Sequence, residues 1–295
     1  MTERGTGMRA LIVPNLEKRN APECTRAVVQ KLLEVGIRPM MQESYRLLLH
    51  LPEAEYCLNS REAFRKADFL IAIGGDGTML HEAKRAVEWD LPLLGINLGR
   101  LGFMAEIEAD ELDLLARLTN GEYTLEDRMM LECTLRQGDS EKRYLALNDV
   151  VLSNGALSRM VDLDILCGGQ MMMSYRANGV IVSTPTGSTA YALSAGGPII
   201  EPSIRCIGLT PICPHSLSTR PVIISDERVL TLTLSPLSRC EVFLTVDGEV
   251  GEPICLNDKV EICRSEKSAR FICLKEKSFY MTIHQKFDTP SGGRL

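Results

Sequence analysis

A strand that leads directly into a glycine-rich turn and then into a helix restricts the fold of this chain more than any other feature. Residues 69–73 read Phe-Leu-Ile-Ala-Ile, a continuous apolar run typical of a strand covered on both faces. Residues 74–78 read Gly-Gly-Asp-Gly-Thr, and a helical pattern then continues to Val87. Strands that are buried on both faces belong to parallel sheets connected by helices. The pattern therefore predicts an α/β fold around this turn.

The remainder of the chain divides into two halves of different character. Before Glu122, apolar runs at 8–13 and 91–96 alternate with helical patterns at 22–35 and 108–118. After Glu122, short β-type runs separated by turn residues follow one another, and a helix is expected only after Ser188. A length of 295 residues suits two compact domains. We therefore predict an α/β N-terminal domain with a mostly parallel sheet (1–125) and a β-rich, sandwich-like C-terminal domain (126–274).

Composition narrows the class of protein. The formal net charge of −6 argues against a nucleic-acid partner, because neutralising a phosphate backbone requires a surplus of Lys and Arg. The ten cysteines form no CxxC pair and the four histidines are isolated, so we expect free thiols and no protein metal site. No apolar run reaches about 18 residues, the length of a membrane-spanning helix. These features favour a cytoplasmic protein without a membrane partner.

The glycine-rich turn is the first candidate site. Glycines are expected to adopt backbone angles closed to other residues and to let a phosphate or ribose approach the main chain, near a helix N-terminus that favours an anion. Gly75, Gly77 and Thr78 are the candidate binding residues. Asp76 is the only ionisable group of the turn, so it is a candidate base for an attacking hydroxyl. The alternative is a tight turn in which Asp76 only caps the helix.

A second polar segment, residues 184–191, reads Thr-Pro-Thr-Gly-Ser-Thr-Ala-Tyr. With Ser183 it places five hydroxyl side chains within seven positions, enough to bind a ribose or a polar heterocycle. Tyr191 adds a flat face for stacking against a base. In the alternative interpretation, the hydroxyl groups only cap a helix that begins near Thr189.

Four further candidates are a polar pair within a β-type run and two arginines. Asn148 and Asp149 interrupt an apolar strand predicted at 146–152, where they either face water on an edge or bind ribose hydroxyls. Arg100 and Arg176 are candidate ligands for phosphate oxygens, although arginines at the surface are usually only solvated.

In combination these motifs resemble the NAD kinase family. The resemblance rests on residues 74–78, on Gly-Ile-Asn-Leu-Gly-Arg-Leu-Gly-Phe at 95–103, on Asn148 and Asp149, and on residues 184–191 with Gly-Gly-Pro at 196–198. It covers about 69–247 in the family's order. The first motif is shared with phosphofructokinases and with diacylglycerol and sphingosine kinases, whereas the run at 184–191 is close to diagnostic.

The resemblance implies a role for each matching residue. Asp76 is expected to contact the ribose hydroxyls and to act as base for the 2′-hydroxyl, with the turn glycines near the phosphates. Asn148 and Asp149 are expected to bind the adenosine part of NAD. The residues expected to line the dinucleotide pocket are Thr186, Thr189, Ala190 and Tyr191.

The family also implies a fold and partners. Its members have an α/β N-terminal domain, to which the last segment of the chain, here about 275–295, returns. The expected substrates are NAD and a nucleotide such as ATP with Mg²⁺ or another divalent cation, and the expected assembly is a homo-oligomer of two or four subunits.

Two positions depart from the family pattern. The acidic residue after Asn148 is usually Glu, so the shorter Asp149 is expected to make a longer or water-mediated ribose contact. Asn178 stands where Asp is common, near the expected nicotinamide end, and its lack of charge is expected to alter the preference between NAD and NADH.

These features predict an NAD kinase that phosphorylates the 2′-hydroxyl of the adenosine ribose of NAD. The alternatives are a non-catalytic regulator that binds NAD(P), and a lipid or sugar kinase that shares the glycine-rich turn.

Overall fold

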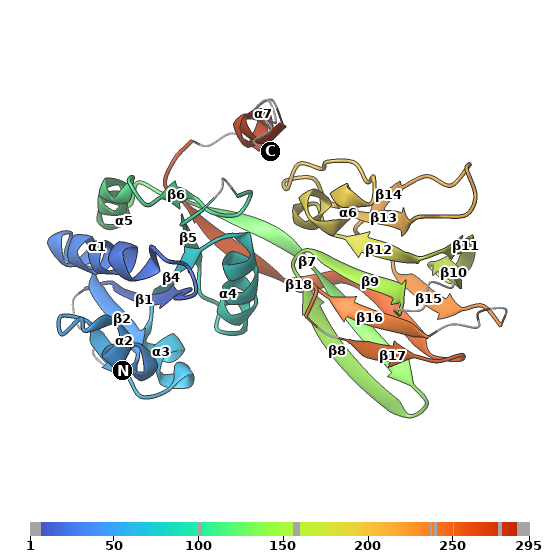
Figure 1. Ribbon diagram of the computed structural model, residues 1–295, viewed down its shortest axis with the longest axis horizontal. Coiled ribbons are helices and arrows are strands. Elements are labelled where there is room, and N and C mark those ends of the chain that lie inside the picture. The colour runs from blue at the N-terminus through green and yellow to red at the C-terminus, as the bar shows by residue number, and fades with distance from the viewer. Residues whose placement is uncertain are drawn as a thin grey trace. The chain divides into compact units, whose positions relative to one another are not determined.

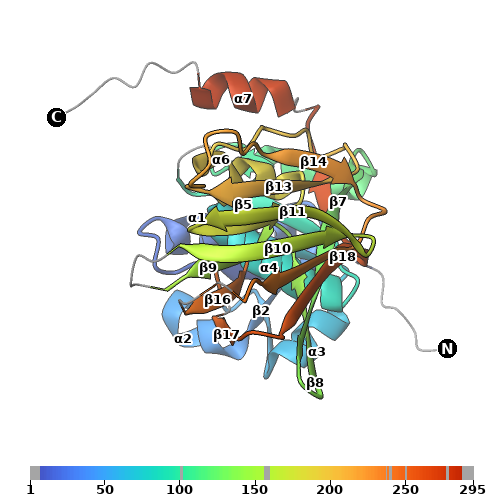
Figure 2. The ribbon, with the colours of Figure 1, turned by 90° about the vertical axis from the view of Figure 1, so that its right-hand side faces the viewer.

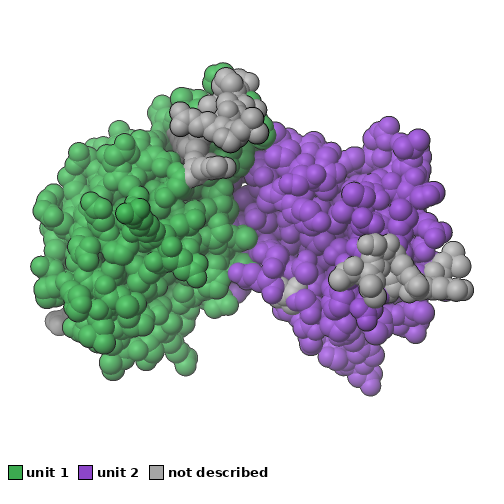
Figure 3. Space-filling model, viewed as in Figure 1, with its two compact units in different colours: residues 1–127, 269–295 green, residues 128–268 purple. Residues whose placement is uncertain are grey.

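The computed structural model describes residues 7–99, 102–155, 160–236, 238, 241–249, 251–276 and 279–287. The chain divides into two compact units, coloured separately in Figure 3. Unit 1 contains residues 1–127 and 269–295, and unit 2 contains residues 128–268. The last segment of the chain thus belongs to the same unit as its first 127 residues.

Unit 1 is built on a parallel sheet with the strand order β3-β2-β1-β4-β5 (Figure 1). The strands are β1 (Arg9–Pro14), β2 (Arg38–Gln42), β3 (Glu55–Cys57), β4 (Phe69–Gly74) and β5 (Leu93–Asn97). All six residues of β4 are buried, as its continuous apolar run predicts. The chain proceeds outward from β1 to β3 and then returns to place β4 on the other side of β1. Ligands of open α/β sheets bind at the carboxyl ends of the strands, where the order reverses in this way.

Helices cover both faces of this sheet. The helix α1 (Ala21–Glu34) buries Val28 and Leu32 against Ile12 of β1 and Ile71 of β4, and α5 (Ala116–Asn120) joins the same apolar cluster. On the other face, Phe64 of α3 (Ser60–Lys66) stacks on Trp89 at the end of α4 (Asp76–Glu88), with ring centroids 6.1 Å apart. The short helix α2 (Arg46–Leu49) lies between β2 and β3 in the chain.

The helix predicted at 108–118 is wrong in its first half. Glu108 ends the short strand β6 (Ile107–Glu108), a 3₁₀ turn spans Leu112–Leu115, and α5 begins only at Ala116. The Glu108 N–H donates to Glu111 Oε2 at 2.8 Å. This local side-chain bond stabilises a turn at the point where the periodicity alone suggested a helix.

The strands of unit 2 pair antiparallel in two groups and face the viewer in Figure 2. The first group contains β8 (Ser140–Ala146), β10 (Val161–Cys167), β11 (Gln170–Ala177), β15 (Leu230–Leu234) and the greater part of β7 (Thr124–Gln137) and of β18 (Lys259–Cys273). The other has the order β14 (Val222–Ser225), β13 (Cys206–Ile212), β12 (Gly179–Ser183), β9 (Asp149–Asn154), β16 (Val242–Val246) and β17 (Glu252–Ile254).

Apolar side chains of both sheets form one core. Burial alternates along β10 and β15, and their inward residues join those of β9, β12 and β16 in a single cluster. Alternation with a period of two is the pattern of a strand with one buried face. The predicted fold classes, an α/β N-terminal part and a β-rich, sandwich-like C-terminal part, are confirmed.

Three of the remaining elements lie close in sequence to the candidate residues or at the end of the chain. A 3₁₀ turn at Thr186–Thr189 and the short helix α6 (Tyr191–Ser194) follow β12. The helix α7 (Phe279–Phe287) follows β18 and belongs to unit 1.

Candidate functional site

Three loops meet at the carboxyl edge of the sheet in unit 1. The Asn15 N–H after β1 donates to the Ile73 carbonyl of β4 at 2.9 Å, and the Leu98 N–H after β5 donates to the Gly74 carbonyl at 2.8 Å. Asn15 Nδ2 donates to Thr78 Oγ1 at 3.2 Å. These bonds fix the glycine-rich turn between its two neighbours.

Asp76 is the first residue of α4, but its carboxylate does not cap that helix. The N-cap position is Gly75, and no side chain caps the helix start. Asp76 Oδ2 accepts a hydrogen bond from the Phe103 N–H at 3.0 Å, and Oδ1 accepts one from the Met104 N–H at 3.2 Å. The capping alternative is therefore wrong: the carboxylate is held by a segment 27 residues further along the chain.

The glycines of the turn act through their lack of a side chain. Gly75 has φ −117°, and neither Gly74 nor Gly77 has a positive φ, so the expectation of backbone angles closed to other residues is wrong. A Cβ on Gly74 would lie 2.3 Å from Thr78 Oγ1, whereas a Cβ on Gly75 or Gly77 would meet nothing within 4 Å. Gly74 thus permits close packing, and the other two leave bare backbone at the helix N-terminus.

A cavity of about 480 Å³ lies at the same edge of unit 1. Its lining includes Asn20 and Glu23 at the start of α1, Asn97 after β5, Glu108 and Asp110. The Asn97 amide donates to both oxygens of Glu108, at 3.1 and 2.9 Å. Three carboxylates in the lining disfavour phosphate groups, so a nucleotide phosphate fits the bare backbone of the turn better than this cavity.

In unit 2, the carboxylate of Asp247 binds three consecutive backbone amides. Asp247 Oδ2 accepts from the Leu147 N–H at 3.0 Å, and Oδ1 accepts from the N–H groups of Asn148 and Asp149 at 2.8 and 3.1 Å. Asp247 has φ 51° and is only 8% exposed. The strand predicted at 146–152 is accordingly interrupted: β8 ends at Ala146 and β9 begins at Asp149. Asn148 lies in the break, because these N–H groups point to a side chain instead of a neighbouring strand.

Asp149 is a buried acid beside a second carboxylate. It is 5% exposed, and burial, with a further contribution from the negative charge of Asp247, raises the pKa of Asp149 to about 7. Three N–H donors stabilise the negative charge of Asp247, whereas Asp149 lies where its own charge is costly. Perturbed acids of this kind are concentrated at functional sites.

The hydroxyl-rich turn after β12 packs directly on Asn148. Thr184 donates its N–H to the Asn148 carbonyl at 2.9 Å and its Oγ1 hydroxyl to the Leu147 carbonyl at 2.6 Å. A Cβ on Gly187 would lie 1.9 Å from the Asn148 carbonyl oxygen. The turn and the Asn148–Asp149 pair therefore form one local structure.

The hydroxyl groups of this turn serve different purposes. Ser188 Oγ donates to the Pro185 carbonyl at 2.6 Å and accepts from the Ile200 N–H at 2.9 Å, so both Thr184 and Ser188 stabilise the fold. Thr186 Oγ1 accepts from Arg128 Nη1 at 3.4 Å, and Thr189 Oγ1 donates to the Thr186 carbonyl at 3.1 Å. Ala190 follows at the N-cap of α6, and Tyr191 is 47% exposed.

The structure places the two remaining candidates around the start of β12. The side chain of Arg176, near the end of β11, is 67% exposed and lies 3.9 Å from Asp162. Asn178 is half-buried; its N–H donates to the Ile212 carbonyl and its carbonyl accepts from the Asn154 N–H, both at 2.9 Å. Arg100 lies outside the described residues.

Sequence reasoning missed Asp247 and the Phe103–Met104 amides. An Asp-Gly pair at a strand end was the available signal for Asp247, whose following Gly248 has φ 74°. The motif at 95–103 includes Phe103, but backbone amides leave no trace in the residue types, so nothing in the sequence indicated their hydrogen bonds to Asp76.

Comparisons with known proteins agree with this arrangement. Residues 10–123 match the family model of the ATP-NAD kinase N-terminal domain, and residues 147–274 match that of the ATP-NAD kinase C-terminal domain. A protein named NAD kinase from Caldanaerobacter subterraneus subsp. tengcongensis is 39% identical over 277 residues, covering 93% of this chain and 97% of that protein. A second, from Geotalea daltonii, is 37% identical over 274 residues, covering 91% and 95%.

Solved structures show the same fold. The crystal structure of yeast NADH kinase complexed with NADH has a TM-score of 0.86 and 26% identity, covering 99% of this chain and 91% of that chain. The structure of an NAD kinase from Archaeoglobus fulgidus in complex with ATP has a TM-score of 0.72 and 24% identity, covering 95% and 98%.

Proposed function

The chain belongs to the NAD kinase family, and from this premise we infer that it transfers a phosphoryl group from ATP to the 2′-hydroxyl of the adenosine ribose of NAD. The observation that carries the residue-level proposal is the geometry of Asp76. Its carboxylate is fixed by two backbone N–H groups at the start of a helix, in a turn whose glycines leave the main chain bare.

In the proposed reaction, the 2′-oxygen of NAD attacks the terminal phosphorus of the donor. The new bond joins that oxygen to phosphorus, the bond from phosphorus to the bridging oxygen breaks, and the nucleoside diphosphate leaves. The proton of the 2′-hydroxyl passes to Asp76. Each carboxylate oxygen retains a lone pair beside its N–H bond, so Asp76 is able to accept this proton while staying in place.

The glycine-rich turn is proposed to hold the donor phosphates. The bare backbone at Gly75 and Gly77, with Thr78, lies at the N-terminus of α4, where N–H groups and the helix dipole favour an anion. We assign Mg²⁺ or another divalent cation to the donor as part of the substrate. No cluster of three or more His, Cys, Asp or Glu suited to a metal exists among the residues that the structure describes.

The dinucleotide is proposed to bind residues of the β-rich domain, 126–274. Asn148 and Asp149 contact the adenosine ribose, and Tyr191 offers an exposed ring for stacking. Thr186, Thr189 and Ala190 line the pocket beside them. Arg176 and Asn178 are assigned to phosphate and nicotinamide contacts respectively.

We also propose a homo-oligomeric assembly and a cytoplasmic location. Family members suggest a homo-oligomer of two or four subunits. Among the described residues no helix is long and apolar enough to cross a membrane. The nine described cysteines are all free thiols, and free thiols are typical of proteins in the reducing cytoplasm.

Two other functions make different predictions. A regulator that only binds NAD(P) has no need of a fixed carboxylate at the phosphate loop, and a lipid or sugar kinase has no need of the turn at 184–191. Both alternatives are tested by supplying NAD, ATP and Mg²⁺ and measuring NADP with an NADP-specific dehydrogenase.

The decisive variant in this assay is Asp76→Asn. It removes the base and places an amide N–H₂ against the Phe103 or Met104 N–H, so we expect kcat to fall by about 10³-fold or more while NAD still binds. Wild-type protein that binds NAD but forms no NADP with any donor would favour the regulator. If Asp76→Asn still forms NADP, the protein is a kinase but Asp76 is not its base.

A further inference from the structure

The C-terminal helix α7 contacts a single side chain from two positions. The ring centroid of Phe279 lies 6.2 Å from that of Phe103, with 45° between the ring planes. Lys286 Nζ lies 4.1 Å from the centroid of the same Phe103 ring. Residues 279 and 286 are seven positions apart and so lie on one face of the helix. This face of α7 therefore packs on Phe103 through an aromatic and a cation–π contact.

Phe103 is also the residue whose N–H binds Asp76. Its amide donates to Asp76 Oδ2 at 3.0 Å, and the adjacent Met104 amide donates to Oδ1 at 3.2 Å. Only the Cα and Cβ atoms separate the Phe103 ring from its peptide group. Fixing the ring therefore restricts the amides that hold the carboxylate.

The chain just before α7 is fixed to the other end of the same segment. Glu106 Oε1 accepts from the N–H groups of Leu274 and Lys275, both at 2.8 Å. Lys275 Nζ also lies 2.5 Å from Glu111 Oε2. Hence the C-terminal part of the chain contacts the 103–106 segment at both ends.

We propose that α7 is a positioning element for Asp76, in which Phe279 and Lys286 hold the Phe103 ring and thereby fix the two amides that orient the carboxylate. This inference rests on the proposed function, in which Asp76 takes the proton of the 2′-hydroxyl. Neither α7 residue touches a reacting atom; both act through Phe103. Placement of a reacting group within a fraction of an ångström is a large part of catalysis by positioning.

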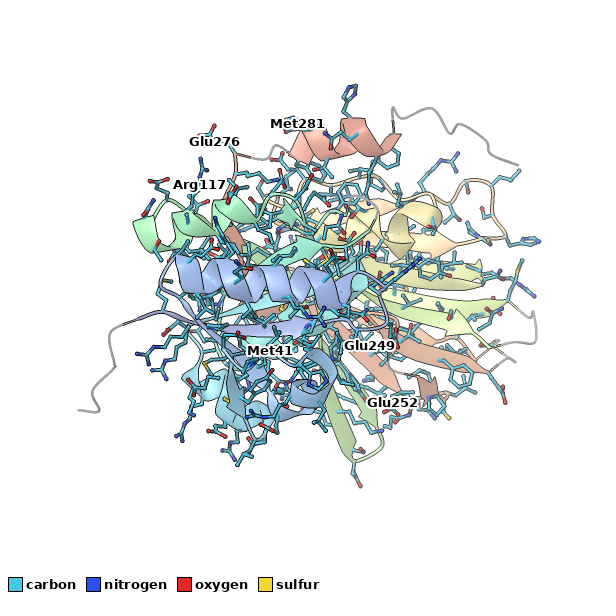
Figure 4. All side chains as sticks on the ribbon, turned by 60° about the vertical axis from the view of Figure 1, so that its left-hand side comes forward. Met41, Arg117, Glu249, Glu252, Glu276 and Met281 are labelled. Carbon is cyan, nitrogen blue, oxygen red and sulfur yellow. The ribbon has the colours of Figure 1, made fainter. Side chains whose placement is uncertain are left out.

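The test begins with four substitutions in the full-length protein. Phe279→Ala removes the ring contact and is expected to lower kcat about tenfold, because small displacements of a base are costly. Lys286→Met keeps the apolar stem but removes the cation, and a loss of about threefold is expected. Phe279→Tyr keeps the ring and should restore the rate. Met281→Ala is the matched control, because Met281 projects from α7 and is 57% exposed (Figure 4).

The split between kcat and KM separates positioning from a purely structural role. If α7 acts on the base, KM for NAD should stay within about twofold while kcat falls. Phe103→Leu keeps the backbone N–H and removes the ring, so its kcat should fall like that of Phe279→Ala, and combining the two should cost no more than either alone. Circular dichroism and thermal melting verify that each variant is folded.

Two results would overturn the inference: folded Phe279→Ala and Lys286→Met with wild-type kcat, or losses in Phe103→Leu and Phe279→Ala that multiply. If Phe279→Ala does not fold, Lys286→Met alone decides. Asp76→Asn separates a failure of the proposed function from a failure of this inference. A wild-type rate in Asp76→Asn would show that Asp76 is not the base. Loss of activity in Asp76→Asn, with an unaffected Phe279→Ala, would contradict only the role of α7.

Discussion

Gly102 lies so close to Asp76 that a Cβ on residue 102 would be 2.0 Å from Asp76 Oδ1. The carboxylate occupies the space that any other residue would need for its side chain. Because Asp76 also binds the next two amides, it cannot withdraw without losing at least one of these hydrogen bonds. The position of the proposed base therefore depends on a glycine 26 residues away.

The first prediction is that Gly102→Ala lowers kcat by about 100-fold with NAD and ATP, because the added methyl group displaces the carboxylate by more than a near-attack geometry tolerates. Gly251→Ala is the control, since a Cβ there meets nothing within 4 Å and its φ lies outside the range that disfavours L side chains. Steady-state kinetics on both variants provide the measurement. A Gly102→Ala protein with a wild-type rate would show that the observed orientation of Asp76 is not needed for turnover.

The sequence predicts the strand, turn and helix around Asp76, but it does not predict the hydrogen-bond partners of the carboxylate. The apolar run at 69–73 and the helical pattern to Val87 are local signals, and β4 and α4 follow them. The partners of Asp76 are backbone amides that any residue supplies, so the motif at 95–103 does not reveal that its last residue binds Asp76. The split of the predicted helix at 108–118 likewise depends on the orientation of one side chain, Glu111.

The Asn148–Asp149 part of the candidate site also depends on contacts between distant residues. The sequence shows the polar pair within an apolar run, but the strand predicted at 146–152 is wrong at its start. The break depends on Asp247, 98 residues further on, whose carboxylate replaces the neighbouring strand as acceptor for three amides. Contacts of this sequence separation become visible only in the folded chain.

The second prediction concerns stability and pH at Asp149. Its folded-state pKa is raised to about 7 from an ordinary value of 3.8. Between these values the folded state keeps a proton that the unfolded chain has lost, so the free energy of unfolding falls as pH rises from about 4 to about 7 and then levels off. Asn at this position never ionises. Asp149→Asn should therefore be more stable than wild type at pH 8, by about 1–3 kcal/mol, and show no such advantage at pH 4.

Urea titrations of both proteins at several pH values provide the measurement. The informative quantity is the difference in unfolding free energy between wild type and Asp149→Asn, because other titrating groups cancel in it. A difference that is constant from pH 4 to pH 8 would mean that folding does not raise the pKa of Asp149.

The third prediction concerns Asn178 and the redox state of the dinucleotide. The nicotinamide ring carries a positive charge in NAD and none in NADH, so a carboxylate near it should favour NAD. Asn178→Asp is expected to raise the ratio of kcat/KM for NAD to that for NADH by about three- to tenfold, the effect of one partly solvated charge pair. Asn178→Ser, which adds no charge, is the control. An unchanged ratio in Asn178→Asp would place residue 178 away from the nicotinamide ring.

The fourth prediction is that Gly187→Ala destabilises unit 2 and weakens NAD binding together. The new Cβ would lie 1.9 Å from the Asn148 carbonyl oxygen. The Asn148 carbonyl accepts a hydrogen bond from the Thr184 N–H at 2.9 Å, and the Asn148 backbone N–H donates one to Asp247 at 2.8 Å. Moving Asn148 away from the new methyl group therefore requires breaking one of these hydrogen bonds. We expect a loss of about 3 kcal/mol in unfolding free energy, the upper end of the usual cost of overpacking, because the new methyl group meets fixed backbone. Gly251→Ala should remain within about 0.5 kcal/mol of wild type.

Urea midpoints measure the change in stability, and calorimetric titration with NAD measures the change in binding. A Gly187→Ala protein as stable as the control would show that the turn at 184–191 is able to move away from Asn148 at little cost.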